Sequence, residues 1–240
     1  MKRSLSWWQR AGLSIANPPL FALESIYPLL MLAVLSLLAF AFHFIRIQFS
    51  EAVDFSLDWN LLLSWIPLLI AFLARYLSKN MGPLPWVIGM LSVVWLAFFP
   101  NAPYMITDLV HLSVNYESDR TWHDAIMLFY YAQISLINGL VSLYWFHGAW
   151  NRTYSKRVGT ILLFLSFPLG GLGVYLGRIL RINSWDLFHK PGQFFLNVFE
   201  NLYDRTALLL IVEFGLLLGT LYAMLWGLLK FRARRQNRVS

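Results

Sequence analysis

The 240-residue sequence contains no cysteine and little charge. The absence of cysteine excludes disulfides, thiolate metal sites and a cysteine nucleophile. Charged residues make up only 13% of the chain, against roughly 25% in ordinary soluble domains. Hydrophobic residues make up 58% and aromatic residues 17%. A soluble protein of this size needs more polar surface, so the composition predicts a protein embedded in a lipid bilayer.

Several motifs that identify common enzyme classes are also missing. The sequence has no glycine-rich phosphate loop, no Gly-x-Ser-x-Gly elbow and no dinucleotide fingerprint. It shows no internal repeat and no linker rich in serine, glycine or proline. We therefore expect one integral membrane domain over residues 1–240. The reaction, substrate, cofactor and oligomeric state are left open.

Long apolar runs predict an all-α membrane bundle of about six transmembrane helices, since a span needs about 20 apolar residues. The expected spans are 26–47, 57–77, 84–100, 124–146, 157–180 and 206–230. Two shorter segments, 102–114 and 194–204, each combine an apolar and a polar face. This pattern is typical of helices in the membrane interface. The first segment could instead be re-entrant or extend the third span.

The basic residues predict the orientation of the spans. With the N-terminus in the cytoplasm, 13 of the 19 lysines and arginines fall on the inner side. The positive-inside rule then places both termini in the cytoplasm, and we expect the protein in the plasma membrane. This placement also accounts for the net charge of +7, so we expect a bilayer rather than nucleic acid as the partner.

A polar stripe follows the third apolar run. Tyr104, Asp108, His111 and Asn115 recur at i, i+4, i+7 and i+11, which predicts one face of an α-helix. Polar groups at a membrane boundary are costly unless they are solvated, paired or used. Asp108 and His111 are therefore candidate catalytic residues, as an acid and base pair or as ligands.

The same stripe also contains candidate metal ligands. Asp108 and His111 lie three residues apart, and His123 with Asp124 could complete a site for zinc or manganese. No metal-binding motif supports this set. The competing interpretation is that these groups cap helix ends and make interfacial hydrogen bonds.

Arg178 and Arg181 lie three residues apart at the outer end of the fifth span, before Asn183 and Asp186. Two guanidinium groups could clamp a phosphate or carboxylate, including a lipid headgroup. The alternative is snorkelling with a salt bridge to Asp186, Asp108 or Glu200. The predicted partner is thus an anionic or lipid-linked small molecule. The candidate ligand-binding residues are Asn101, Tyr104, Arg178, Arg181, Asn183 and Asp186.

Glu213 is an isolated charge within the sixth span, about 10 Å from its start at 1.5 Å per residue. Gln133 in the fourth span is expected at similar depth and could hydrogen-bond it. A carboxyl at this depth predicts a proton or cation site. A protonated, paired glutamate that helps helices associate is equally compatible with the sequence.

Two separated motifs resemble an uncharacterised, mostly bacterial membrane family, domain of unknown function 1361. The first motif is residues 99–104 (Phe-Pro-Asn-Ala-Pro-Tyr), followed by 107–109 and 111–112. The second is residues 173–178 (Gly-Val-Tyr-Leu-Gly-Arg), with Arg181 and 183–186. The resemblance covers about residues 30–230. It implies a multi-pass helical protein and supplies no activity or catalytic residues.

Three classes of function remain. One is an outward-facing enzyme or ligand-binding protein that uses the two motifs. Another is a small transporter or channel that uses Glu213, although no inverted repeat supports it. The third is a non-catalytic assembly partner. The sequence favours a ligand-binding or catalytic site on the outer face.

Overall fold

The computed structural model of the chain describes residues 26–48, 56–114 and 121–239, and all regular structure in them is helical. Six helical segments are long and apolar enough to cross a membrane, which confirms the expected all-α bundle. These segments are Tyr27–Ile47, Ser56–Asn80, Pro85–Val110, Trp122–Thr153, Lys156–Arg178 and Arg205–Phe231. The third runs past the expected boundary at residue 100, because helical structure continues through Pro100 and Pro103.

The contacts of the chain divide it into two compact units, residues 1–53 and 54–240. The first unit contains helix α2 (Tyr27–Ile47), whose first turn carries a proline. Its 21 residues correspond to a length of about 31 Å, close to the thickness of a bilayer core. The expected single domain over residues 1–240 stays a prediction.

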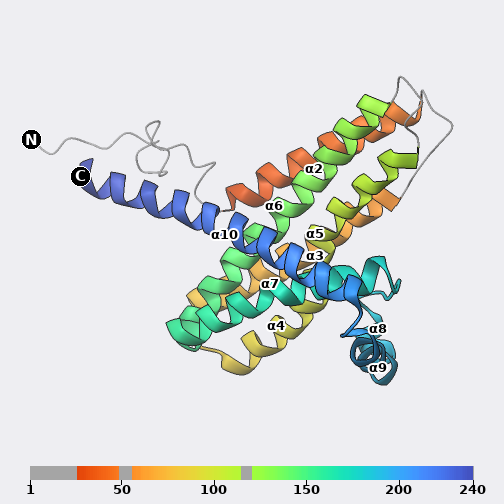
Figure 1. Cartoon of the computed structure of the whole chain (residues 1–240). Helices are drawn as coiled ribbons and strands as arrows, with labels where there is room; N and C mark the ends of the chain where they lie inside the picture. The colour runs from red at the N-terminus through yellow and green to blue at the C-terminus, as the bar shows by residue number, and fades with distance from the viewer. Residues whose placement is uncertain (1–25, 49–55, 115–120, 240) are drawn as a thin grey trace, which may run out of the picture. The chain divides into compact units, whose positions relative to one another are not determined.

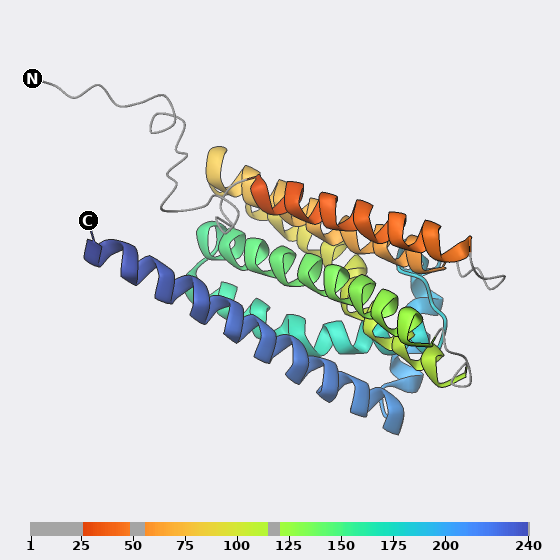
Figure 2. The same cartoon turned by 90° about the horizontal axis from the view of Figure 1, so that it is seen from above.

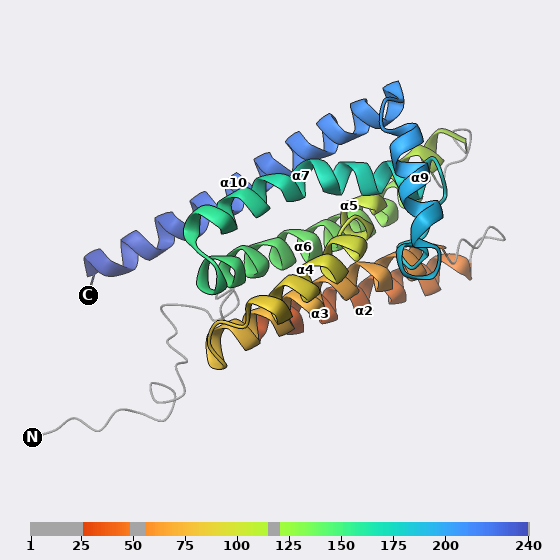
Figure 3. The same ribbon diagram turned by 90° about the horizontal axis from the view of Figure 1, so that it is seen from below.

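The second unit contains the remaining helices (Figure 1). They are α3 (Ser56–Asn80), α4 (Pro85–Phe98), α5 (Asn101–Tyr104), the 3₁₀ helix η2 (Met105–Val114), α6 (Thr121–Thr153), α7 (Lys156–Arg178), α8 (Asp186–His189), α9 (Pro191–Asn201) and α10 (Arg205–Val239). Figure 3 shows α10, α7, α6 and α3 side by side in that order. Seen from above in Figure 2, the C-terminal part of α10 continues past the turn between α6 and α7.

Helix α6 is central because it packs against both α3 and α7. Buried polar side chains join it to its neighbours. Asn138 donates a hydrogen bond to the Ser64 hydroxyl at 2.9 Å, and the Trp95 indole donates to the Ser142 hydroxyl at 3.1 Å. Between membrane helices such bonds contribute about 0.6 kcal/mol each on average. They fix which faces of α3, α4 and α6 meet.

The core between α4 and α6 is aromatic. Trp95, Phe99, Phe146 and Trp150 are all at most 2% exposed. The Trp95 ring lies 4.5 Å from Phe99, 4.9 Å from Phe146 and 5.7 Å from Trp150, measured between ring centroids. The first pair is stacked, the second tilted and the third edge-on, and aromatic pairs of this kind contribute about 0.5–1.5 kcal/mol beyond the area they bury. This cluster holds α4, and with it the first motif, against α6.

The glycines of α7 allow close helix contacts. A Cβ on Gly171 would lie 2.7 Å from the Leu210 carbonyl oxygen in α10. A Cβ on Gly173 would lie 2.1 Å from Cγ of Pro100. Only glycine leaves room for these approaches, as is common where membrane helices pack closely. Helix α7 is thus pressed between α10 and the Pro100 turn.

The helices meet the second motif at one end of this unit. We name the end that carries Asn60, Tyr104 and Arg178 the motif end. There α9 runs across the ends of α7 and α10 (Figure 3). Phe194 and Val198 of α9 pack against a cluster that includes Tyr175 and Leu176 of α7. Helix α9 occupies Pro191–Asn201 rather than the expected 194–204, since Asp204 instead caps α10 by accepting a hydrogen bond from the Ala207 amide.

Candidate functional site

At the motif end, the first motif continues from α4 as a series of short helical segments. Helix α4 ends at Phe98, and the short α5 contains Pro103. From Met105 to Val114 the chain forms a 3₁₀ helix. Of the expected helical segment 102–114, residues 102–104 are thus α-helical, and the expected α-helical periodicity is wrong from Met105 on. A hydrogen bond from the Thr107 hydroxyl to the Tyr104 carbonyl, 2.6 Å, supports the tighter turn.

The change of helix type alters which residues share a face. With three residues per turn, positions 105, 108, 111 and 114 align in a 3₁₀ helix. Tyr104 belongs to the preceding α5, yet it and Asp108 both hydrogen-bond Arg178. The first two members of the expected stripe thus meet at one side chain, and the stripe as a whole stays a prediction. The side chain of His111 and all of Asn115 lie outside the described part of the structure.

The structure pairs the two motifs through Arg178 and Asp108. The guanidinium donates a hydrogen bond to Oδ1 of Asp108 at 2.8 Å and lies over the Tyr104 ring, 5.6 Å from its centroid. It also donates to the Tyr104 hydroxyl at 3.3 Å and to the Thr107 carbonyl at 3.2 Å. The salt bridge to Asp108, one of the three partners considered from the sequence, is thus formed.

Asp108 is almost completely enclosed by this pairing. Its side chain is 3% exposed, and Oδ2 accepts a hydrogen bond from Asn60 of α3 at 3.3 Å. Both carboxylate oxygens are thus used to join η2 to α7 and α3. This arrangement supports a positioning role for Asp108, because a carboxylate that acts as a general base must reach its substrate.

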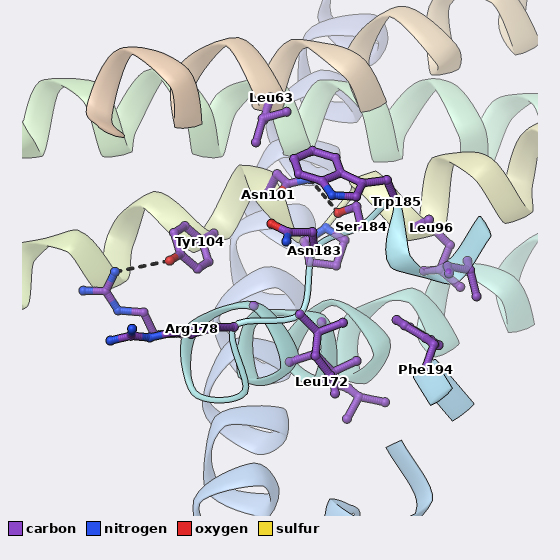
Figure 4. Close-up of a pocket in the computed structure, with 18 of the residues that line it drawn as sticks. Leu63, Leu96, Asn101, Tyr104, Leu172, Arg178, Asn183, Ser184, Trp185 and Phe194 are labelled. Carbon is purple, nitrogen blue, oxygen red and sulfur yellow. Dashed lines mark hydrogen bonds between the residues drawn. The ribbon is translucent and has the colours of Figure 1, made fainter. Parts of the chain in front are cut away.

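A cavity of about 820 Å³ opens beside this pair, enclosed by α3, α4, α5, α7 and α9 together with the segment that joins α7 to α9. Its size falls within the usual range of ligand pockets, about 300–1,000 Å³. The polar side chains that line it are Asn60, Asn101, Tyr104, Arg178, Arg181, Asn183 and Ser184. Figure 4 shows Asn101, Asn183 and Ser184 close together, and Tyr104 beside Arg178. Six of the seven come from the two motifs, and Asp and Glu are absent from the described lining.

The segment after α7 is tied to the first motif. Asn101 donates one hydrogen bond to the Phe98 carbonyl at 3.0 Å and another to the Ser184 hydroxyl at 3.1 Å. Asp186 does not line the cavity; its carboxylate accepts a hydrogen bond from the Asn183 amide at 2.8 Å. That bond shapes the turn which holds Asn183 and Ser184 at the cavity.

Arg181 differs from Arg178 in both backbone and contacts. Its φ of 55° is the one positive value for a non-glycine residue in the described ranges. Its side chain is exposed, lines the cavity, and forms no ion pair within those ranges. Left-handed backbone at an arginine costs about 1–2 kcal/mol, and such outliers often lie at binding sites. Among the described residues, Arg181 is therefore the arginine of the cavity that has no ion-pair partner.

The described residues contain no cluster that joins the candidate metal ligands. His123 and Asp124 lie in the first turn of α6, where His123 is exposed. No group of three or more His, Asp or Glu side chains that could hold a metal occurs in the parts that the structure describes. Because the His111 side chain is outside them, the metal site stays a prediction.

The expected partnership of Glu213 and Gln133 is not seen. Both side chains are exposed, and these two described side chains form no hydrogen bond with each other. They do not line the cavity. The structure thus separates these two intramembrane polar residues from the two motifs.

Sequence reasoning missed the contribution of α3. Asn60 contacts Asp108, and two residues earlier Asp58 accepts a 2.5 Å hydrogen bond from the Tyr131 hydroxyl of α6. The available signal was a pair of polar residues in the first turns of an otherwise apolar helix. It went unused because no local pattern connects α3 with residue 108.

Comparison with known proteins agrees with the two motifs. The family described as "Protein of unknown function (DUF1361)" matches residues 59–221. Neither the curated proteins nor the solved structures gave a match to this chain. The matched region contains most of α3 and all helices from α4 to α9. This multi-pass membrane protein belongs to the DUF1361 family.

Proposed function

We propose that this plasma-membrane protein binds an anionic small molecule, free or lipid-linked, in the motif-end cavity, which opens on the outer side of the membrane. The observation that carries the proposal is a cavity lined by two arginines and no described acidic residue. Asp108 neutralises Arg178, so Arg181 supplies the positive charge that an anion would meet. Guanidinium groups suit phosphate and carboxylate because they donate two parallel hydrogen bonds.

The nearby polar side chains complement this charge. Asn183 and Ser184 are held beside Asn101 by the turn described above. Amide and hydroxyl groups offer further donors to the oxygens of a bound anion. In this proposal Arg181 contacts the ligand, whereas Asp108 and Arg178 act as positioning residues that fix the cavity wall.

The outer location of the cavity follows from the distribution of basic residues. An even number of spans, both termini in the cytoplasm and the positive-inside rule together place the motif end outside. A phosphatase inserted at Ser118 should be exported and active, and a fluorescent reporter fused after Ser240 should remain cytoplasmic. An inactive phosphatase at Ser118, beside a well-expressed protein, would contradict this orientation.

Binding can be tested on the purified full-length protein in a non-ionic detergent by native mass spectrometry. The probes are glycerol 3-phosphate and oleoyl lysophosphatidic acid, which share one phosphate group. At least one probe should bind, and Arg181→Gln should weaken it about ten- to one-hundred-fold, because a hydrogen bond to a charged group contributes about 1.5–3 kcal/mol.

Arg205→Gln is the matched control for this experiment. Arg205 is an exposed arginine at the start of α10, near the same end of the bundle, and it does not line the cavity. Its replacement removes the same charge and should leave affinity within about two-fold. Absence of binding by both probes, or equal effects of the two substitutions, would refute the proposal.

A further inference from the structure

The cavity has a polar end, at the motif end of the helices, and an apolar inner part, which we call the apolar depth. On α7 the lining residues run from Leu169 through Leu172 and Leu176 to Arg178. Nine residues of α-helix correspond to about 13 Å. On the facing path the lining runs from Val93 and Leu96 to Asn101 and Tyr104. Apolar side chains thus occupy the part of the cavity inside the spans, and the polar side chains occupy the span ends.

The lining of α3 shows the same order. Trp59 and Asn60 lie within two turns of its first residue, and Leu63 follows one turn deeper. In Figure 4, Leu96, Leu172 and Phe194 lie on one side of the cavity, and Tyr104 and Arg178 lie on the other. On all three segments, apolar lining residues therefore lie farther from the motif end than the polar ones.

The depth of the apolar part matches one leaflet of a bilayer. The apolar residues from Leu169 to Leu176 extend about 10 Å along α7, and with Arg178 the lining reaches about 13 Å, which compares with about 15 Å for half of a 30 Å hydrocarbon core. A soluble anion such as inorganic phosphate would use the polar end and leave the apolar part filled with water at a cost. An amphiphile would bury its chain there while its headgroup stays level with the span ends.

Charge complementarity selects the headgroup. Arg178 is committed to Asp108, Tyr104 and Thr107. Arg181 has no ion pair among the described residues, and the cavity lining contains no described carboxylate. A phosphate, with several acceptor oxygens, can engage the guanidinium together with neighbouring amide and hydroxyl donors.

We infer that the ligand of this site is a phosphate-bearing amphiphile, with its headgroup on Arg181 and its chain in the apolar depth lined by Leu96, Leu172 and Phe194. This inference rests on the proposed function and specifies its substrate class. Helix α9 forms a side wall of the cavity with Phe194, Phe195 and Val198. In this inference the wall separates the acyl chain of the ligand from the outside of the protein. The free phosphate compound without a chain is the alternative source of the same headgroup chemistry.

The test compares a chain-length series on the unmodified protein: glycerol 3-phosphate, octanoyl lysophosphatidic acid and oleoyl lysophosphatidic acid. Affinity should rise with chain length, with at least a ten-fold gain from the first probe to the last. Monooleoylglycerol, which keeps the chain and lacks the phosphate, should bind at least ten-fold more weakly than oleoyl lysophosphatidic acid. These measurements need no variant, so they stand even if a variant misfolds.

A pair of substitutions on α7 then locates the chain. Leu172→Trp fills the apolar depth and should weaken oleoyl lysophosphatidic acid at least ten-fold, while glycerol 3-phosphate changes less than two-fold. Leu165 is the matched control, because it lies two helical turns away on the same face, is 50% exposed and does not line the cavity. Leu165→Trp should leave both affinities within two-fold.

The possible failures are distinguishable. Equal affinity for glycerol 3-phosphate and the oleoyl compound, or an unchanged oleoyl affinity in a folded Leu172→Trp protein, overturns the amphiphile inference and leaves anion binding intact. Tight binding of monooleoylglycerol overturns the assignment of the headgroup. Loss of all phosphate binding overturns the proposed function as well.

Discussion

Replacing Arg178 by methionine removes the cation that compensates a buried carboxylate and keeps a long apolar side chain. The Asp108 side chain is 3% exposed and accepts a 2.8 Å hydrogen bond from this guanidinium. Removing one partner of a buried pair costs about 3–5 kcal/mol, since the other charge stays buried. We therefore expect Arg178→Met to lower the free energy of unfolding by about 3–5 kcal/mol.

The reverse substitution should cost less. Asp108→Asn keeps the shape of the side chain, and the Arg178 side chain is 21% exposed, so water can partly solvate the guanidinium that is left. The expected loss is about 1–3 kcal/mol. The double variant should be more stable than the sum of the two single changes predicts, by at least about 1 kcal/mol, because the residues are in direct contact.

These values can be measured by unfolding the protein reversibly with sodium dodecyl sulfate in mixed micelles, followed by circular dichroism. The order of the two single variants is the sharpest outcome, because it depends on the difference in exposure between the partners. Losses below about 0.5 kcal/mol in both would show that the pair behaves as an exposed surface salt bridge. Additivity in the double variant would show that the two side chains are not coupled.

The same unfolding assay checks two contacts between helices. Gly173→Ala should lower stability by about 1–3 kcal/mol because the added methyl group has no room beside the first motif, whereas Gly227→Ala, which meets nothing within 4 Å, should not lower it. Tyr131→Phe should lower stability by about 1.5–3 kcal/mol through loss of the hydrogen bond to Asp58. The control Tyr203→Phe, at an 86% exposed position, should change little; equal effects within either pair would contradict the assigned contact.

Much of the fold could be predicted from the sequence because the bilayer constrains it strongly. Runs of about 20 apolar residues have few alternatives to a spanning helix. The expected spans 57–77 and 206–230 lie within the apolar helices Ser56–Asn80 and Arg205–Phe231. The amphipathic pattern near 194–204 likewise corresponds to a separate helix, α9. Local patterns were sufficient for these elements.

The site was only partly predictable because it depends on contacts between distant segments. The sequence was compatible with three acidic partners for Arg178, and the choice of Asp108 depends on how α7 packs against the first motif, as at Gly173 and Pro100. The 3₁₀ geometry of 105–114 depends on local turn chemistry that periodicity does not show. The hydrogen bond from Asn60 to Asp108 could not be predicted, because the sequence does not show that α3 lies beside η2.

The backbone at Arg181 has a consequence for how the site should be viewed. Glycine adopts a φ of 55° without steric cost, whereas any other side chain strains the chain there. Folding alone would thus be served better by glycine at this turn. The protein instead has an arginine at this left-handed position, beside a cavity whose described lining contains no carboxylate. Glycine at position 181 would favour stability, whereas arginine places a positive charge at the cavity, and the sequence has arginine.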